Sequence, residues 1–314
     1  MDNWVKGMRD FFFQSLFDQA KKNRNIILVT SDTGAICHDK FKDELNEQYI
    51  NVGIAEQNMI GVAAGLALSG KIVYVYAIVP FATMRCYEQI RVDLCCMELP
   101  VNIVGIGAGL DYSTLGATHH GTEDIALMRL LPAMKIYSPS DNLTAGVFAK
   151  ADPQQNGPRY IRLDRTGFPL VYKDENDIDL SKGFSNLKKG KDLYIIATGR
   201  MVHSALEIAK KLSVQSISTG VIDLFRIKPF NKKMVWDTIK NVGHLVTLEE
   251  HFLTGGIGSL VSGMLAVKEN APVFKSIGIP DQFCKMYGER EYLQKSYGID
   301  TDSIEKSIKG WIKK

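Results

Sequence analysis

The sequence predicts an α/β protein built from two doubly wound domains, each with a mostly parallel sheet flanked by helices. Three observations lead to this prediction. Short apolar segments alternate with longer helix-like segments over most of the chain. Most of the apolar segments are continuous rather than alternating, as expected for parallel strands that are covered on both faces. A stretch rich in Pro, Lys, Asp and Glu interrupts the alternation near the middle of the chain, which is typical of a domain boundary.

The first half of the chain contains six predicted strands between predicted helices. The strands are expected at residues 26–29, 49–52, 72–79, 101–106, 134–137 and 159–163. Apolar residues recur at helical spacing from Trp4 to Ala20, which predicts an amphipathic first helix. Later helices are predicted to begin near Glu56, Pro80 and Thr122, with Asp141 as the cap of a further one. The helix from Pro80 is expected to run to about residue 98.

The second half repeats the alternation after a predicted linker. We expect a first domain over residues 1–170, a linker over 171–190 and a second domain over 191–314. Strands of the second domain are predicted at 193–198, 216–221, 245–248 and 273–277, and helices at 202–212, from about 231 and from about 256.

Composition excludes several classes of protein. Among 314 residues, 45% are apolar and 23% charged, which suits a globular protein, and a net charge of +3 does not favour a nucleic-acid partner. No apolar segment reaches the roughly 18–20 residues that span a bilayer, and the N-terminus does not resemble a signal peptide. Five cysteines without a C-x-x-C pair indicate reduced thiols in a cytoplasmic protein, with Cys95 and Cys96 expected in the core.

One segment carries the first candidate for chemistry. The predicted strand 49–52 ends at Gly53 and leads into a helix dense in Gly and Ala, with Glu56 in its first turn. A carboxylate at this position can simply favour the helix N-terminus, which contributes about 0.3–1 kcal/mol. It can also be a carboxylate held in a packed setting where its protonation is tuned for catalysis.

The residues of this segment resemble a known family. G-I-A-E-Q-N at 53–58, followed by G-V-A-A-G-L-A at 61–67, is similar to the transketolase family of thiamine diphosphate enzymes. Further segments agree in family order, at 81–91, 116–120, 138–141, 246–251 and 255–259. Deoxyxylulose-phosphate synthases and the beta subunits of 2-oxo acid dehydrogenases are related to this family. The resemblance covers almost the whole chain and the C-terminal half of a typical transketolase, which implies a pyrimidine-binding domain followed by a transketolase C-terminal domain.

The resemblance implies roles for residues around a thiamine cofactor. Glu56 matches the glutamate that hydrogen-bonds a ring nitrogen of the aminopyrimidine and promotes its imino form. Phe81 matches the aromatic residue that stacks on this ring, although core packing at a helix start would also explain it. Ile54 and Ile78 lie close enough in the sequence to line the same pocket.

A second group of residues is implied to face the substrate. His119 matches the histidine of the family's G-x-T-H segment, which faces the reacting carbonyl, and a loop histidine is the alternative. A metal pair with His120 is not expected, because adjacent histidines point apart and a third ligand of obvious spacing is missing. Leu115 stands where the family usually has an aspartate that contacts a sugar hydroxyl, and His120 replaces a common glutamine. Leu115 therefore puts the standard sugar donor in question.

Arginines supply the candidates for phosphate binding. Arg162 matches a family arginine that reaches the phosphate of a sugar substrate, and a surface arginine at a strand end is the alternative. Arg85 and Arg91 are further candidates, but their spacing also fits one polar helix face with an internal ion pair.

A missing motif leads to the predicted assembly. The family binds diphosphate and Mg²⁺ through a Gly-Asp-Gly motif in its N-terminal half, and this sequence contains no such motif. We therefore expect an N-terminal partner subunit to carry the Mg²⁺ site, and self-association of this chain to give a heterotetramer.

The predicted function is that of the C-terminal subunit of a split transketolase-like transferase. It would move a two-carbon ketol or acyl unit between carbonyl or sugar-phosphate substrates, only with its partner. Two alternatives are a 2-oxo acid dehydrogenase beta subunit and a catalytically silent subunit that stabilises its complex.

Overall fold

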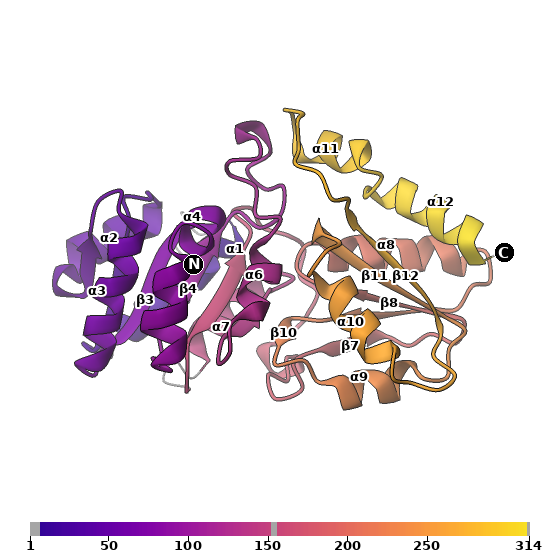
Figure 1. Ribbon diagram of the computed structural model, residues 1–314, viewed down its shortest axis with the longest axis horizontal. Helices are drawn as coiled ribbons and strands as arrows, with labels where there is room; N and C mark the ends of the chain where they lie inside the picture. Colours follow the sequence, from indigo (N-terminus) through magenta and orange to yellow (C-terminus); the bar gives the residue numbers. More distant parts are fainter. Residues whose placement is uncertain (1–6, 152–155, 313–314) are drawn as a thin grey trace. The chain divides into compact units, whose positions relative to one another are not determined.

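The computed structural model describes residues 7–151 and 156–312, which form two units of α/β structure (Figure 1). The first unit comprises the chain up to Ala108 together with residues 127–177, and the second comprises residues 109–126 and the chain from Ile178 onward. The segment 109–126 thus groups with the second unit, although it directly follows a strand of the first. In the described part of the chain, no helix is long and apolar enough to cross a membrane.

The first unit contains a parallel sheet with the strand order β5-β6-β4-β3-β1-β2. Its strands are β1 (Ile26–Thr30), β2 (Tyr49–Asn51), β3 (Ile72–Ile78), β4 (Asn102–Ile106), β5 (Lys135–Tyr137) and β6 (Arg159–Leu163). Its helices are α1 (Met8–Ala20), α2 (Ile36–Glu44), α3 (Glu56–Leu68), α4 (Val79–Thr83), α5 (Tyr87–Gln89) and α7 (Asn142–Lys150), with α6 (Asp124–Leu130) beginning in the second unit and ending in the first. The predicted strands of this half are therefore confirmed, whereas α2 was not predicted. Trp4 lies outside the described residues.

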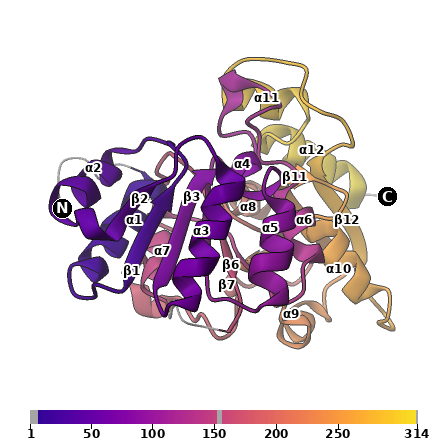
Figure 2. The same ribbon diagram turned by 60° about the vertical axis from the view of Figure 1, so that its left-hand side comes forward.

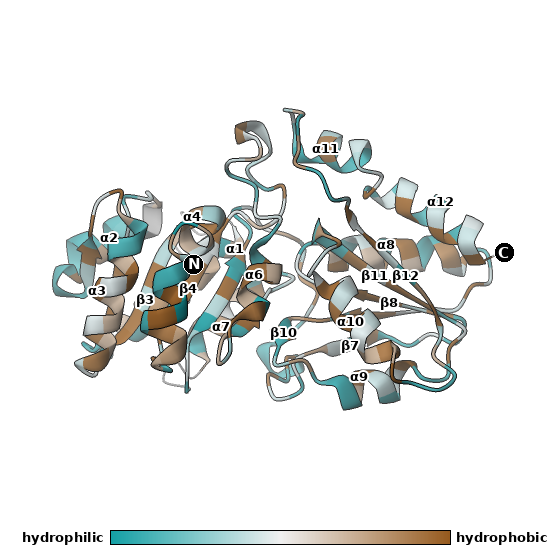
Figure 3. Ribbon diagram, viewed as in Figure 1, coloured by the Kyte–Doolittle hydropathy of each residue, from teal (hydrophilic) through white to brown (hydrophobic). Residues whose placement is uncertain are grey.

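Apolar strands at the centre of this sheet form its core. Every residue of β1 and β4 is buried, as is β3 from Ile72 to Ala77, and Figure 3 shows β3 as largely hydrophobic. Helix α3 packs on β3, while α1 and α7 pack on each other. In Figure 2, α3 lies in front of the strands, with α1 and α7 behind them. Covering both faces explains why these strands are continuously apolar.

Asp141 caps α7, as its position in the sequence predicts. Its Oδ1 accepts hydrogen bonds from the backbone N of Thr144 at 2.7 Å and from the Thr144 hydroxyl at 2.6 Å. The other oxygen accepts from the backbone N of Val171 at 2.7 Å and of Tyr172 at 3.3 Å. Since Asp141 is fully buried, one carboxylate both begins a helix and fixes the segment that ends the first unit.

The continuous helix predicted from Pro80 to residue 98 is wrong. The segment divides into α4, α5 and a wide π-helical stretch at Ile90–Cys96. The Thr83 hydroxyl donates to the carbonyl of Val79 at 2.6 Å, and the Cys86 thiol donates to the carbonyl of Phe81 at 3.4 Å. Such side-chain bonds to preceding carbonyls compete with the helical ladder and bend it. Cys96 is exposed, which also corrects its expected place in the core, whereas Cys95 is buried.

The second unit contains a sheet with the strand order β12-β11-β8-β9-β7. Its strands are β7 (Ser185–Lys188), β8 (Leu193–Ala197), β9 (Thr219–Asp223), β11 (His244–Phe252) and β12 (Val273–Ile279), and a short strand β10 spans Arg226–Lys228. Helices α8 (Met201–Ser213), α9 (Lys232–Ile239) and α10 (Ile257–Leu265) were predicted, whereas α11 (Arg290–Ser296) and α12 (Thr301–Ile312) were not. β7 lies in the expected linker, where it pairs antiparallel with β9. The α/β class and the mostly parallel sheets are confirmed.

Glu249 explains two of the sequence segments that resemble the family. Its Oε2 accepts from the backbone N of Ile257 at 2.7 Å and its Oε1 from the backbone N of Gly258 at 2.8 Å. A Cβ at Gly256 would lie 1.9 Å from Glu249 Oε2, so only glycine allows this approach. A carboxylate at a helix N-terminus satisfies amides that the helix leaves unpaired. Segments 246–251 and 255–259 are thus linked by one structural contact.

We predict that Asp141→Ala lowers the free energy of unfolding by about 2–4 kcal/mol, since it removes a helix cap and leaves buried amides unsatisfied. Urea denaturation followed by circular dichroism measures this change. Asp237→Ala is the matched control, because Asp237 is an exposed aspartate that pairs with Lys240 at 3.0 Å, and its loss should cost about 0.5 kcal/mol or less. Equal effects of both substitutions would contradict the capping role.

Candidate active site

The first candidate residues lie at one edge of the first sheet. Glu56 begins α3 directly after β2, and Phe81 lies in α4 directly after β3. β2 and β3 flank β1 on either side, with Leu28 paired to Tyr49 and to Tyr74. In parallel α/β sheets, ligands bind at the carboxyl ends of the strands. The topology therefore brings Glu56 and Phe81 to the edge where a site is expected.

Glu56 is a buried carboxylate with one cationic partner. It is 3% exposed, and Arg85 Nη1 donates to its Oε2 at 3.0 Å. The guanidinium carbon of Arg85 also lies over the ring of Phe81, 4.0 Å from the centroid. Because the Arg85 side chain is 45% exposed, the pair is closed on the Glu56 side and open to solvent on the other. Three residues singled out in the sequence thus form one cluster.

Cys86 adds a thiol to this cluster. It is fully buried, and burial, with the negative charge of Glu56 beside it, raises the pKa of the Cys86 thiol to about 12. A thiol with this pKa stays protonated near neutral pH and is a poor nucleophile. The chemistry available at this position is therefore that of the carboxylate.

The two isoleucines predicted for the same pocket differ in exposure. Ile54 is 79% exposed in the turn between β2 and α3, and Ile78 is half-buried at the end of β3. Both lie at the same sheet edge as Glu56. The structure does not test their role in binding, which stays a prediction.

The arginines predicted for phosphate binding have different surroundings. Arg162 lies in β6 opposite Gly105 of β4 and is 4% exposed, so the alternative of a surface arginine is wrong. Arg91 Nη1 lies 3.5 Å from Glu88 Oε1 on an exposed helix face, which agrees with the alternative of an internal ion pair. Arg85 instead joins Glu56, a partner 29 positions away that helical spacing could not indicate.

The loop that carries the predicted substrate residues is anchored within the second unit. Gly109 and Gly121 exchange backbone hydrogen bonds at 2.9 and 2.8 Å, which closes the loop at its base. The backbone N of Leu110 donates to Glu250 Oε2 at 3.1 Å, and a Cβ at Gly109 would lie 2.3 Å from that oxygen. Glu250 therefore contacts the start of the loop directly.

Glu250 belongs to a buried ion cluster that sequence reasoning missed. Arg290 Nε donates to both of its carboxylate oxygens, at 3.2 and 3.0 Å, Arg290 Nη2 also donates to Oε2, and Gln294 Nε2 donates to Oε1 at 2.6 Å. Arg290 Nη1 lies 3.5 Å from Asp111 Oδ1 in the loop. Burial alone would raise the pKa of Glu250, but the guanidinium of Arg290 holds that pKa at about 2. In the sequence, only the acidic pair at 249–250 and the distant G-E-R-E segment at 288–291 hint at this cluster.

The loop presents its two histidines differently. His119 is half-buried, and its Nδ1 lies 2.9 Å from the Thr118 hydroxyl. His120 is 2% exposed, its Nε2 has no hydrogen-bond partner among the described residues, and burial lowers its pKa. Leu115 is 48% exposed in the short helical turn Ser113–Leu115. Within the described residues, no group of three His, Cys, Asp or Glu side chains is placed to hold a metal ion.

Comparison with known families identifies the family of this chain. Residues 7–169 match the family described as the transketolase pyrimidine binding domain, and residues 184–304 match the transketolase C-terminal domain. The chain belongs to the transketolase family. This confirms the resemblance seen in segments 53–67 and 81–91, and the fold of each unit is the one that the family implies.

Relatives of full length place this transketolase-family chain among separate C-terminal subunits. It is 35% identical to one subunit of the apulose-4-phosphate transketolase of Phocaeicola vulgatus, over 100% of both chains. It is 33% identical to a 6-deoxy-6-sulfo-D-fructose transketolase subunit of Clostridium sp., covering 96% of this chain and 92% of the relative. A solved structure described as "Split gene transketolase, inactive beta4 tetramer" is similar, with a TM-score of 0.87, 33% identity and coverage of 98% and 99%. The predicted function of a transketolase-like C-terminal subunit is thus confirmed.

The family implies thiamine diphosphate, and the Glu56 cluster fits its pyrimidine. The face of Phe81 and the carboxylate of Glu56 are both engaged by one planar, hydrogen-bonding cation, the guanidinium of Arg85. A flat heterocycle with ring nitrogens offers the same two features, an aromatic face and a group that hydrogen-bonds the carboxylate. The donor set therefore suits this cofactor.

We predict that Glu250→Gln destabilises the chain by about 3–5 kcal/mol at neutral pH, because the buried Arg290 loses its main counter-charge and keeps only Asp111, at 3.5 Å. The pKa of Glu250 is lower in the folded chain than in the unfolded one. Its contribution is therefore complete above about pH 4.5 and is lost as the pH falls toward 2. The difference between the two proteins should shrink over that window.

Thermal unfolding from pH 2.5 to 7 measures the effect of Glu250→Gln, and amide hydrogen exchange shows whether residues 109–121 open first. Glu291→Gln is the control, because Glu291 lies on the same helix as Arg290 and its side chain is 74% exposed. A constant gap between wild type and Glu250→Gln across this range would refute the role of the ionised carboxylate.

Proposed function

We propose that this chain and an N-terminal partner subunit form a thiamine diphosphate-dependent, transketolase-like enzyme that moves a two-carbon ketol or acyl unit between carbonyl or sugar-phosphate substrates. The observation that carries the proposal is Glu56, buried at the start of α3 beside Phe81 and Arg85. Membership of the family supports the reaction class. The relatives' names support separate subunits, and one relative is described as an inactive tetramer of beta chains. Mg²⁺ and the diphosphate would be held by the partner, and a heterotetramer is the assembly we expect.

The chemistry that thiamine diphosphate supplies is a thiazolium carbon that becomes a nucleophile once its proton is lost. Glu56 would hold a pyrimidine ring nitrogen through its buried carboxylate and so favour the imino form that accepts that proton. Phe81 would orient the ring by stacking. Arg85 now covers one face of Phe81, so stacking on that face requires Arg85 to turn outward. Its 45% exposure leaves room for this movement.

The loop residues would serve the sugar. His119 can donate a proton to an oxygen that gains negative charge, because imidazole titrates near neutral pH. Glu250 and Arg290 would position the loop that carries His119 rather than touch the substrate. Arg162 remains the proposed contact to an anionic group. The two named relatives act, by their names, on a phosphorylated and a sulfonated sugar, so a ketose with a terminal anion is the substrate class we expect.

The main test is Glu56→Gln in the enzyme reconstituted with its partner. The substitution keeps the shape of the side chain and removes its charge, so hydrogen–deuterium exchange at the thiazolium carbon should slow by about 100-fold or more. The melting temperature should stay close to that of the wild type if the carboxylate is catalytic. Glu88→Gln is the matched control, since Glu88 is exposed and pairs with Arg91 nearby.

Wild-type exchange in Glu56→Gln would overturn the proposed catalytic role.

Calorimetry of this chain alone with thiamine diphosphate and Mg²⁺ tests the need for a partner. Micromolar binding by the single chain would contradict that part of the proposal.

We also predict that Leu115 makes the donor site less polar than in a typical transketolase. An apolar side chain cannot accept a hydrogen bond from a sugar hydroxyl, and an unpaired buried hydroxyl costs about 1–3 kcal/mol. The reconstituted enzyme should therefore prefer donors that lack a hydroxyl at the contacted carbon, and Leu115→Asp should raise kcat/KM for xylulose 5-phosphate relative to pyruvate. Leu130→Asp, at an exposed leucine of α6, is the control. Best use of the hydroxylated sugar, with no gain from Leu115→Asp, would reject the idea.

A further inference from the structure

A groove of about 510 Å³ lies in the second unit, beside the edge strand β12 and the last helix, α12. Lys275 comes from β12, and the other lining residues come from one face of α12, namely Ser303, Lys306, Ser307, Gly310 and Trp311. The buried side of this helix is formed by Ile304 and Ile308, and α12 packs on α8. The groove therefore runs along a helix whose core contacts are made by other residues.

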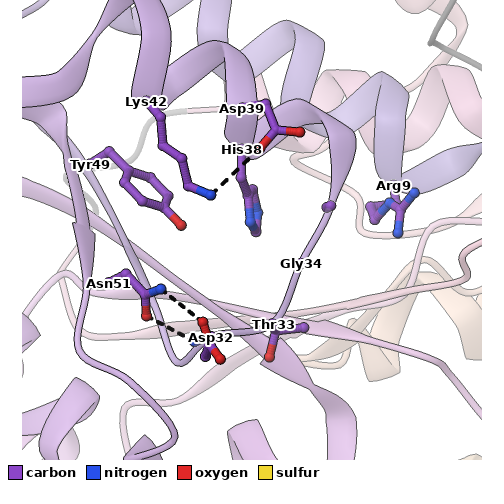
Figure 4. A pocket seen from close by; sticks show the side chains of 10 residues that line it. Arg9, Asp32, Thr33, Gly34, His38, Asp39, Lys42, Tyr49 and Asn51 are labelled. Atoms are coloured by element: carbon purple, nitrogen blue, oxygen red, sulfur yellow. Dashed lines mark hydrogen bonds and ion pairs between the residues drawn. The ribbon is translucent and has the colours of Figure 1, made fainter.

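This groove differs from the polar pocket drawn in Figure 4. That pocket opens at the carboxyl ends of β1 and β2, where Asp32 and Asn51 line it. Because Glu56 begins the helix that follows β2, the pocket of Figure 4 lies at the same sheet edge as the proposed cofactor site. The groove beside α12 shares no residue with the Glu56 cluster or with the loop at 109–121. Its lining therefore needs an explanation of its own.

Trp311 provides a flat aromatic surface in the groove. Its side chain is half-buried. The His244 ring meets the indole nearly at right angles, with the two centroids 5.0 Å apart, and Lys275 Nζ lies 5.9 Å from the indole centroid. Since His244 begins β11 and Lys275 lies in β12, the sheet holds the indole while part of it stays open to solvent. An indole held in this way can stack on another flat ring.

Two lysines give the groove a positive charge. Lys275 Nζ donates to the Ser307 hydroxyl at 2.7 Å, and neither Lys275 nor Lys306 forms an ion pair with a described residue. The lining contains no Asp or Glu. The two acidic residues of α12, Asp302 and Glu305, pair with lysines outside the groove at 2.7 and 2.5 Å. The two ammonium groups therefore have no counter-charge within the described chain, which suits an anion that can also accept from a hydroxyl, such as a phosphate.

Gly310 keeps the groove open beside Trp311. A Cβ at Gly310 would meet no atom within 4 Å, so a larger residue would fit at this position. Glycine is also one of the least favourable residues in a helix, because it loses more backbone freedom on folding than other residues do. Neither packing within the described chain nor helix stability explains this glycine. Room for a ligand next to the indole explains it.

We propose that this groove binds a planar aromatic compound that carries a phosphate, the chemical class of a nucleoside monophosphate. The ring would stack on Trp311 in the space that Gly310 leaves, and the phosphate would lie between Lys275 and Lys306, where the Ser307 hydroxyl can also donate to it. An aromatic surface alone would accept any flat compound, and two lysines alone would accept any anion, so the combination selects this class. Binding here is independent of the proposed transfer reaction, because it uses other residues and requires neither cofactor nor partner.

Calorimetric titration of the full chain alone tests the proposal, with adenosine monophosphate, adenosine and inorganic phosphate as probes. Adenosine monophosphate should bind saturably with a Kd of about 1 mM or lower, and the other two should bind at least about tenfold more weakly. Lys306→Met should weaken adenosine monophosphate by about tenfold and leave adenosine unchanged. Lys309→Met is the matched control and should keep wild-type affinity, because Lys309 lies on the same helix outside the groove and pairs with Glu305.

A second variant fills the space beside the indole. Gly310→Leu should weaken both adenosine monophosphate and adenosine by about tenfold, since the leucine side chain would occupy the place of the ring. The melting temperature should not fall, because the position is open and leucine favours a helix. Gly263→Leu is the matched control, because Gly263 is an exposed glycine of α10 whose Cβ would also meet no atom within 4 Å.

Should Gly310→Leu fail to fold, the indole ¹H–¹⁵N signals of the wild-type chain decide the point. The signal of Trp311 must shift on adding adenosine monophosphate, whereas that of Trp236 in α9 must not. The proposal is overturned by absence of saturable binding, by adenosine or phosphate binding as tightly as adenosine monophosphate, or by wild-type affinity in Lys306→Met or Gly310→Leu, which would put the bound nucleotide outside the groove. Because cofactor and partner are absent, each of these results leaves the proposed transferase reaction untouched.

Discussion

A carboxylate buried as deeply as that of Glu56 needs a partner, and the surroundings of the site follow from that requirement. An ionised carboxyl group without a counter-charge or hydrogen bonds is too costly to keep in a protein interior. Glu56 meets the condition with the N-terminus of α3 and with Arg85. Arg85 in turn needs a place for its flat guanidinium and finds it on Phe81. One constraint thus accounts for why three residues, from the start of α3 and from the segment that follows β3, gather at one edge of the first sheet.

The same pair chemistry appears twice in the chain with opposite consequences. The Arg85 side chain is 45% exposed, so water can replace its contact with Glu56 at small cost. The Arg290 side chain is 9% exposed and bonds both oxygens of Glu250, so removing either partner leaves a buried charge. The exposure of the arginine therefore distinguishes the two pairs. The Arg85–Glu56 pair can be exchanged for a ligand, whereas the Arg290–Glu250 pair is permanent and anchors a loop.

Much of the first unit could be predicted because its determinants are local. Continuous apolar runs identify β1, β3 and β4, and Gly53 followed by a small-residue helix places Glu56 at a helix start. The contacts that were not predicted join residues far apart in the sequence. Glu250 reaches Leu110 across 140 positions, and Arg290 reaches Asp111 across 179, which is why segment 109–126 groups with the second unit. The spacing of apolar residues in a sequence cannot predict contacts over such distances. The break in the helix after Pro80 depends on hydroxyl and thiol bonds to earlier carbonyls, for which helix propensity gives no sign.

Cys86 shows how burial and one charge act together at this site. Arg85 pairs with Glu56, while the pKa of the neighbouring Cys86 thiol is raised first by burial and then by the charge of Glu56. A thiol beside a buried carboxylate would suggest a nucleophile on residue type alone, yet a pKa of about 12 keeps it protonated and inert. Burial, and to a smaller extent the charge of Glu56, therefore keep the Cys86 thiol from acting as a nucleophile. A site with this charge arrangement can hold and orient a heterocycle and adjust its protonation, which is what the pyrimidine side of a thiamine enzyme must do.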